Sequence, residues 1–152
     1  MTRSAIGWLW VAGQAVLLVC VVLLPGRADW PTPGWLEAVA GIVFFAGLAV
    51  IGAAALGLGR ALTPTPVPNH RGDLITNGFY RYVRHPIYTG VLAVVTGMTL
   101  RSGSWPVLAV ATLTFVFFDR KAAWEEQQLV SQFPDYPTYA ARTPRFIPQP
   151  WR

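Results

Sequence analysis

The chain has 152 residues, which is the length of one domain. Hydrophobic residues make up 53% of it and charged residues only 12%, which leaves too few charges to cover a water-facing surface, so the composition excludes an ordinary soluble domain and indicates a membrane protein. The net charge of +5 comes with no basic stripe or RNA-binding motif, so we expect no nucleic-acid partner.

The first predicted element is an apolar run from residue 5 to residue 24 that carries no charge. About 20 helical residues cross the hydrocarbon layer of a bilayer, so we predict a retained transmembrane helix. A signal peptide is the competing interpretation because Arg3 precedes the run, but the sequence LPGR at its end is no cleavage site. The single cysteine, Cys20, lies in this run and predicts helix packing rather than a disulfide or a metal site.

A second apolar run covers residues 34–58 and predicts a second transmembrane helix. Its second half is rich in glycine and alanine. The pairs Ala53/Gly57 and Ala55/Gly59 are one helical turn apart, a spacing that predicts close approach of another helix at these positions.

Residues 60–69 contain three prolines and are predicted to run extended along the membrane surface. They lead to residues 72–90, GDLITNGFYRYVRHPIYTG, which concentrate arginine, histidine and tyrosine between apolar runs. Asn77-Gly78 predicts a turn there. Pro86 can begin the next helix, because its missing N–H would be unpaired at that position anyway.

Two shorter apolar runs follow, at residues 88–100 and 106–118. Each would rise only about 20 Å as a helix. Residues 101–104 predict a tight turn between them, with Ser104 as the N-cap of the second helix. We therefore predict a helical hairpin that is tilted, extended by polar turns at its inner end, or only partly inserted.

The last of these helices is predicted to continue to Phe133, where Pro134 stops it, and the proline-rich tail to form an irregular arm over the inner face. With four crossings, ten of the 12 lysine and arginine residues fall on one side, and Arg27 and Arg101 on the other. The positive-inside rule places the ten, and both termini, in the cytoplasm. We expect an all-α integral membrane protein with four transmembrane helices.

This topology brings two polar clusters to the same face, one at residues 80–88 and one on the helix after the hairpin. His85 can then share a pocket with Glu125 and Glu126. Adjacent carboxylates on a helix point about 100° apart, so we expect at most one of the two to face this pocket directly. For the helix cluster alone, the simpler interpretation is an i, i+4 surface pair of Lys121 with Glu125.

Several chemistries lack their motifs. The sequence has no GxGxxG, P-loop or G-x-S-x-G pattern, and with only His70 and His85 it has no HExxH site, so we expect no metal. The remaining pocket offers aromatic rings, a histidine, a carboxylate and cations beside a lipid-accessible hairpin. Such a pocket suits a charged cofactor from water and an apolar substrate from the bilayer.

Three segments together closely resemble the isoprenylcysteine carboxyl methyltransferase family and its phospholipid methyltransferase relatives. They are the stretch L-I-T-x-G-x-Y-R-Y-x-R-H-P-x-Y-x-G at residues 74–90, the glutamate pair at 125–126, and a closing Y-x-x-Y-x-x-x-T-x-R-F-I-P at 136–148. The resemblance covers roughly residues 60–148. It favours a functional Glu125 over a surface pair.

The resemblance implies an integral membrane enzyme that binds S-adenosylmethionine at the cytoplasmic face and methylates a lipid-like acceptor. Residues 1–152 would form a single domain, with two transmembrane helices in 1–59 and a catalytic core in 60–148. The acceptor stays open between a prenylated thiol acid, a phospholipid amine and another lipid-like carboxylate or amine.

Carried over residue by residue, the implied cofactor contacts are Gly72, Asp73, Leu74, Ile75, Tyr80, His85, Pro86, Ile87, Tyr88 and Glu125. Apolar and aromatic groups can enclose adenine and the sulfonium methyl, and a glutamate complements the cofactor's ammonium or ribose hydroxyls. Relatives that act on a prenylated cysteine carboxylate tend to have an arginine one turn before that glutamate. This chain has Lys121 there, with Arg120 beside it, and we expect these two to bind the acceptor.

Methyl transfer from a sulfonium to an anion needs a dry, oriented site and no strong base, so we assign His85 to cofactor binding. An ammonium acceptor would need a base, for which His85 or Glu126 are candidates. The alternative is an NADPH-dependent membrane steroid-type reductase, since those enzymes share the R-H-P-x-Y loop but often have Asn where this chain has Ile87. A third possibility is a non-catalytic membrane protein that keeps only the scaffold.

Overall fold

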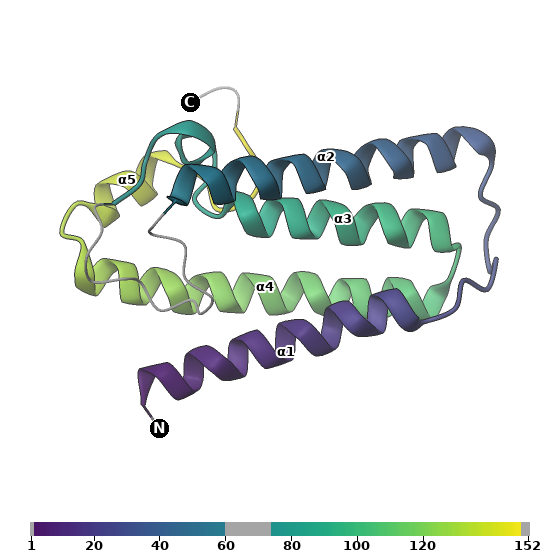
Figure 1. Cartoon of the computed structure of the whole chain (residues 1–152), viewed down its shortest axis with the longest axis horizontal. Helices are drawn as coiled ribbons and strands as arrows, with labels where there is room; N and C mark the ends of the chain where they lie inside the picture. The colour runs from purple at the N-terminus through teal and green to yellow at the C-terminus, as the bar shows by residue number, and fades with distance from the viewer. Residues whose placement is uncertain (1, 60–73, 150–152) are drawn as a thin grey trace.

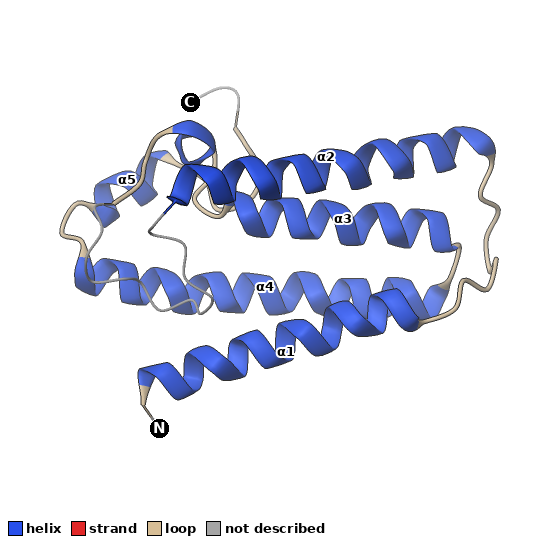
Figure 2. Ribbon diagram, viewed as in Figure 1, coloured by secondary structure: helices blue, strands red, loops and turns tan. Residues whose placement is uncertain are grey.

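The computed structural model describes residues 2–59 and 74–149. In these ranges every regular element is a helix, as Figure 2 shows. Four long helices form an elongated bundle, and two short ones lie at one end of it (Figure 1). The predicted extended segment 60–69 and the predicted cofactor contacts Gly72 and Asp73 lie outside the described residues.

The two N-terminal helices are α1 (Arg3–Leu23) and α2 (Gly34–Leu58), which confirms both predicted apolar helices to within two residues. They are the described helices that are long and apolar enough to cross a membrane. Large apolar side chains point outward from both, with Leu23 74% and Leu56 84% exposed. Exposed apolar side chains of this kind favour an apolar environment, in agreement with the composition.

The hairpin is formed by α3 (Pro86–Ser102) and α4 (Trp105–Gln132). Gly103 ends α3 with φ +58°, the left-handed conformation that glycine adopts without strain. Ser104 is the residue before α4, but its side chain makes no capping hydrogen bond. Instead Asp29, from the loop between α1 and α2, accepts a hydrogen bond of 2.8 Å from the Trp105 N–H. The hairpin is thus confirmed, and the cap comes from a distant loop.

α3 packs mainly on α2, along a seam of small residues. A Cβ atom added to Gly90 would lie 2.7 Å from the Gly47 carbonyl oxygen, and one added to Gly97 would lie 2.6 Å from that of Ala40. Ala40 and Gly47 are seven residues apart on α2, and Gly90 and Gly97 are seven residues apart on α3. This spacing keeps side chains on one face of two packed helices. The two backbones are therefore in direct contact.

The close approach predicted at Ala53/Gly57 and Ala55/Gly59 is wrong in register. A Cβ atom at Gly57 or Gly59 would meet nothing within 4 Å. The buried small residue in that part of α2 is Ala54, seven residues after Gly47. The seam follows the seven-residue spacing, and the predicted pairs lie on neighbouring faces of the helix.

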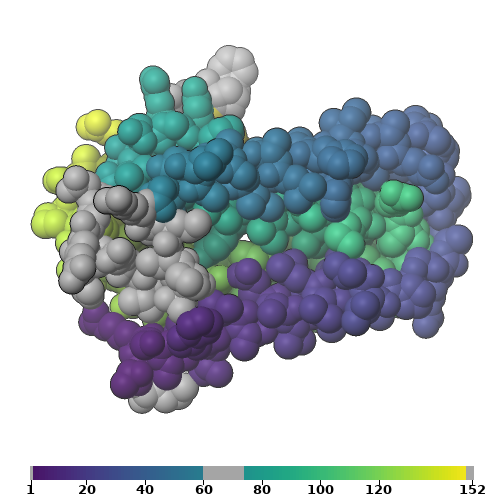
Figure 3. Space-filling model, viewed as in Figure 1, coloured from purple at the N-terminus to yellow at the C-terminus, as the bar shows by residue number. Residues whose placement is uncertain are grey.

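α1 lies against α4 on the other side of the bundle, and Figure 3 shows it as a separate flank along the molecule. The Trp10 and Phe117 rings meet edge to face at 5.1 Å. Near the C-terminal end of α1, Val21 packs in a small core with Val107 and Ala111 of α4 and Val95 of α3.

The polar end of the bundle contains η2 (Gly78–Arg81) and α5 (Tyr136–Arg142), and the N-terminal end of α1 lies there too (Figure 1). α4 ends at Gln132, as Pro134 predicts. The expectation of a wholly irregular tail is wrong, because α5 is regular. After α5 the chain runs beside the start of α3, where the N–H groups of Arg84 and His85 donate to the carbonyl oxygens of Pro144 and Arg145.

Candidate functional site

His85 is fixed in place by its backbone. Its N–H donates to the tail at 3.1 Å, and its carbonyl oxygen accepts hydrogen bonds from the N–H of Thr89 at 2.9 Å and from its hydroxyl at 3.2 Å. Pro86 follows at the first position of α3, where no N–H is needed. The buried imidazole stacks on Tyr88 with the two ring planes only 3° apart.

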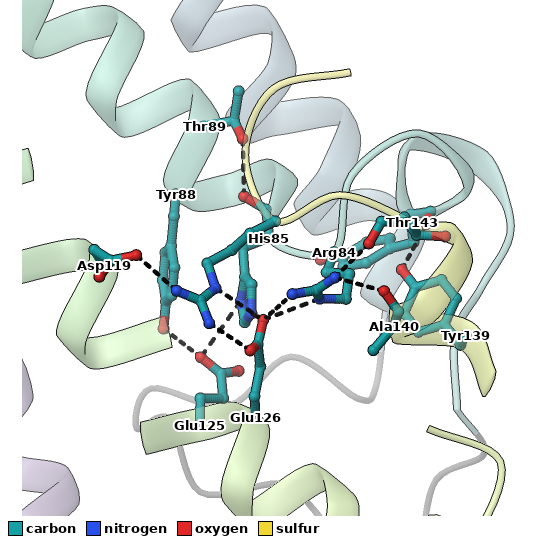
Figure 4. A network of polar contacts seen from close by, with 12 residues as sticks. Arg84, His85, Tyr88, Thr89, Asp119, Glu125, Glu126, Tyr139, Ala140 and Thr143 are labelled. Atoms are coloured by element: carbon teal, nitrogen blue, oxygen red, sulfur yellow. Dashed lines mark hydrogen bonds and ion pairs between the residues drawn. The ribbon is translucent and has the colours of Figure 1, made fainter. Parts of the chain in front are cut away.

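Both glutamates of α4 reach the His85 imidazole (Figure 4). The Nε2 atom lies 3.2 Å from Glu126 Oε1, and Nδ1 lies 3.8 Å from Glu125 Oε2. The expectation that at most one carboxylate would face the pocket is therefore wrong. A glutamate has three rotatable side-chain bonds, so carboxylates whose Cα–Cβ bonds diverge on a helix can still converge on one ring.

Glu126 is the centre of an ion-pair network. Its carboxylate accepts hydrogen bonds from Arg84 Nε at 2.9 Å and from Arg145 Nη2 at 2.7 Å, in addition to the contact with His85. Burial raises the pKa of Glu126, but the hydrogen bonds from His85, Arg145 and Arg84 outweigh burial and hold it well below its usual range. Glu126 is therefore ionised, and its oxygens are occupied by cations.

The two arginines extend this network to three chain segments. Arg84 also donates to the carbonyl oxygens of Ala140, at 2.9 Å, and of Thr143. Arg145 pairs with Asp119 of α4 at 2.6 Å. The network therefore ties the segment before α3, the polar half of α4 and the tail into one unit.

Glu125 has a different environment from its neighbour. Its Oε2 atom accepts a hydrogen bond of 2.6 Å from the Tyr88 hydroxyl. Its Oε1 atom accepts none from any residue that the structure describes. Burial raises the pKa of the Tyr80 phenol in η2. The negative charge of nearby Glu125 raises this pKa further. Among the described residues, Glu125 thus combines a fixed orientation with a carboxylate oxygen that has no hydrogen-bond partner.

The remaining predicted residues occupy different surroundings. Leu74, Ile75 and Ile87 are half-buried, and Arg120 is exposed on α4. Lys121 is buried, and its ammonium donates to Gln14 of α1 instead of pairing with Glu125. The surface-pair interpretation of Lys121 is therefore wrong.

Several residues of the site were not predicted as such from the sequence. They are Arg84, Asp119, Arg145, Gln14 and Tyr136. The Tyr136 hydroxyl is buried and has no hydrogen-bond partner in residues 2–59 and 74–149. No group of three or more metal-ligating side chains gathers in those ranges.

The profile of the phospholipid methyltransferase family matches residues 36–135. The cobalt-zinc-cadmium resistance protein CzcN of Cupriavidus metallidurans is 29% identical over 151 residues, which cover 98% of this chain and 66% of that protein. The nickel-cobalt-cadmium resistance protein NccN of Alcaligenes xylosoxydans xylosoxydans is 27% identical over 98% of this chain and 67% of its own length. The chain thus spans about two thirds of the length of these relatives.

A third relative matches a smaller part of the chain. The protein-S-isoprenylcysteine O-methyltransferase of Schizosaccharomyces pombe is 36% identical over 77 residues, which are 49% of this chain and 33% of that enzyme.

Proposed function

The chain belongs to the phospholipid methyltransferase family, and on this premise we propose that it is a membrane methyltransferase that transfers a methyl group from S-adenosylmethionine to a lipid-like acceptor at the cytoplasmic membrane face. The similarity to an isoprenylcysteine O-methyltransferase supports methyl transfer over the reductase alternative. The observation that carries the proposal is Glu125, which Tyr88 orients while its other carboxylate oxygen has no hydrogen-bond partner in the described residues.

The residues around Glu125 fit the chemistry of the proposed cofactor. A carboxylate oxygen complements its ammonium or its ribose hydroxyls. The buried Tyr136 hydroxyl lacks a partner in the described residues, and leaving such a group unsatisfied costs about 1–3 kcal/mol, so a ligand acceptor would stabilise it. Burial also raises the Tyr136 pKa, which keeps the hydroxyl protonated as a donor.

The proposed cofactor-binding residues are Leu74, Ile75, Tyr80, His85, Pro86, Ile87, Tyr88 and Glu125, with Tyr136 added and with Gly72 and Asp73 carried over from the sequence alone. The parallel rings of His85 and Tyr88 offer π faces, which attract a cation such as a sulfonium. Their fixed orientation supports a site that aligns the methyl donor.

Bound S-adenosylmethionine would supply an electrophilic methyl group on its sulfonium. The chain's own residues would bind it, align it and keep water out of the site. Glu126 is a poor candidate for the general base, because its lowered pKa and its hydrogen bonds with Arg84, Arg145 and His85 keep it ionised and occupied. His85 Nε2 faces Glu126, so Nδ1 is the ring nitrogen left for an ammonium acceptor.

The proposed membrane arrangement has four crossings, with the polar network and both ends of the chain on the cytoplasmic side. The common position of α5, η2 and the start of α1 at one end of the bundle supports it (Figure 1). Residues 1–152 would act as one domain, since helices from both halves pack together. Lys121 and Arg120 are proposed to bind the acceptor.

A labelled-methyl assay tests this function. Membranes containing the wild-type chain are expected to transfer label from S-adenosylmethionine into added lipid extract or into N-acetyl-S-farnesylcysteine, and Glu125→Ala membranes with equal amounts of protein are expected to transfer little. Equal transfer by the variant would refute the assigned site, and NADPH consumption without methyl transfer would favour a reductase.

A further inference from the structure

Lys121 is the single lysine of the chain, and its side chain is buried. Helical side chains lean toward the helix N-terminus, which for α4 lies at the end of the bundle away from α5 (Figure 1). Lys121 is only 3% exposed, and its ammonium donates to Gln14. Lysines near a membrane surface normally extend toward water. Here the charge is kept inside the bundle.

The ammonium has few compensating partners. It lies 4.9 Å from the centroid of the Tyr88 ring and 5.6 Å from that of Phe118, and its hydrogen bond is to the neutral Gln14 oxygen. No ion pair joins it to a carboxylate in the part of the chain that the structure describes. Burial lowers the Lys121 pKa to about 8, although the nearby Glu125 opposes this shift. A buried cation with neutral partners is costly unless a ligand uses it.

Gln14 is itself an exception on its helix. It is the one amide in the apolar run at residues 5–24. The close contact of α1 with α4, where a Cβ atom at Gly13 would lie 2.9 Å from the Phe117 ring, brings it within reach of the ammonium. α1 lies outside residues 36–135, which match the family profile.

The Lys121 ammonium is also next to the proposed reaction site. It lies over the ring of Tyr88, whose hydroxyl orients Glu125. An acceptor headgroup placed at the ammonium would therefore be close to the proposed cofactor site. An anionic oxygen, from a lipid carboxylate or a lipid phosphate, is the group that compensates the cation.

We propose that Gln14 is a positioning residue of the acceptor site, which holds the Lys121 ammonium inside the bundle so that it binds an anionic oxygen of the acceptor headgroup. The assignment to an acceptor rests on the proposed methyltransferase function. The pairing of Gln14 with Lys121, and the affinity of the Lys121 ammonium for an anion, can be tested without cofactor or turnover.

The single lysine allows a direct measurement. Protein labelled with lysine-13Cε gives one side-chain signal, whose pH titration reports the ionisation of Lys121 alone. The charged or titratable groups that face it are Glu125 on its own helix and Tyr88 on α3, and α1 contributes the neutral Gln14. We expect a wild-type midpoint near 8, a higher midpoint in Gln14→Glu and a lower one in Gln14→Leu, each by about one unit.

Ala12→Leu is the matched control, because Ala12 is on the exposed side of the same helix, and its midpoint should equal that of the wild type. Palmitate and hexadecyl phosphate are then added as anionic probes, with hexadecanol as the neutral probe. At least one anionic probe should raise the wild-type midpoint and have a smaller effect in Gln14→Leu, and comparison of the two separates a carboxylate from a phosphate. Hexadecanol should have no effect.

An ordinary lysine midpoint that neither Gln14 variant moves, or a midpoint that neither anionic probe moves, would overturn the proposal. S-adenosylhomocysteine binding, measured on the same samples, separates the two claims. If the anion response is present but the cofactor analogue does not bind, the methyltransferase function fails while the anion subsite stands. If the analogue binds but the anion response is absent, only the present proposal fails.

Discussion

Glu125 and Glu126 are adjacent on α4, yet we expect them to have different roles. Glu126 is surrounded by His85, Arg84 and Arg145, whereas the one hydrogen bond that Glu125 accepts from a described residue comes from the Tyr88 hydroxyl. The first arrangement holds the tail and α4 together, and the second suits a ligand. Substitution of Glu126 should therefore mainly lower stability, and substitution of Glu125 should mainly weaken ligand binding.

Replacement of Glu126 by glutamine should lower stability more than the same change at Glu125. Two arginines would lose their shared anion in a half-buried site, and a loss of this kind costs about 1–3 kcal/mol. Thermal unfolding in detergent, followed by circular dichroism, compares the two variants. Equal melting temperatures for Glu126→Gln and Glu125→Gln would contradict the assigned role of the network.

The network also predicts an acid dependence of stability. The pKa of Glu126 is lowered in the folded protein, so its contribution is complete above the ordinary glutamate pKa of 4.5 and is lost as the pH falls below that value. We expect the melting temperature of the wild type to fall in this acid range. Glu126→Gln should fall less steeply there, and parallel curves for the two proteins would refute the assignment.

Sequence motifs located most residues of the site but not their pairings. His85, Tyr88 and Glu125 are recognisable because they belong to a compact motif and a nearby glutamate pair. Arg84 and Arg145 carry no local signal for their common partner, because that contact depends on how the tail folds back along α3. The direction of Lys121 was missed for the same reason, since Gln14 is 107 residues away.

At the scale of elements, the glycine seam between α2 and α3 positions the polar end of the bundle. We expect Gly47→Leu to destabilise the protein, because the backbone of Gly90 leaves no room for a side chain, and such overpacking costs about 1–3 kcal/mol or more. Gly57→Leu is the matched control on the same helix, with open space at its Cβ position. Size-exclusion chromatography and thermal unfolding should show loss in the first variant only.

Hydropathy predicted the existence of these helices but not the register between them. The second half of α2 has small residues on several faces, so composition cannot identify the one that α3 covers. The seven-residue repeat of Ala40, Gly47 and Ala54 becomes decisive once the partner positions Gly90 and Gly97 are known. The register between α2 and α3 depends on both helices, so the sequence of either helix alone does not specify it.

For the whole molecule, the alternation of apolar runs was enough to predict a helical bundle with a C-terminal hairpin. Charge asymmetry then predicted which loops share a side of the membrane. The regular helix α5 and the pairing of the tail with the segment before α3 were not foreseen, because a proline-rich sequence has no periodic pattern, and pairing of this kind depends on tertiary contacts.

The proposed topology predicts opposite accessibility for the two ends of the bundle. On a Cys20→Ala background, cysteine is introduced at Arg27, in the loop between α1 and α2, or at Asp135, beside α5; both positions are exposed. A membrane-impermeant maleimide added to intact cells should label Arg27→Cys only, and Asp135→Cys should react after lysis. Labelling of both positions in intact cells would exclude an odd number of crossings between them.

The most direct test of the whole account is calorimetry of S-adenosylhomocysteine binding to the purified protein in detergent. We expect saturable binding to the wild type, unchanged binding to the control Glu37→Gln on exposed α2 surface, and at least tenfold weaker binding to Glu125→Gln, which corresponds to about 1.4 kcal/mol. Absence of saturable binding to folded wild-type protein, or binding of NADPH in its place, would contradict the account.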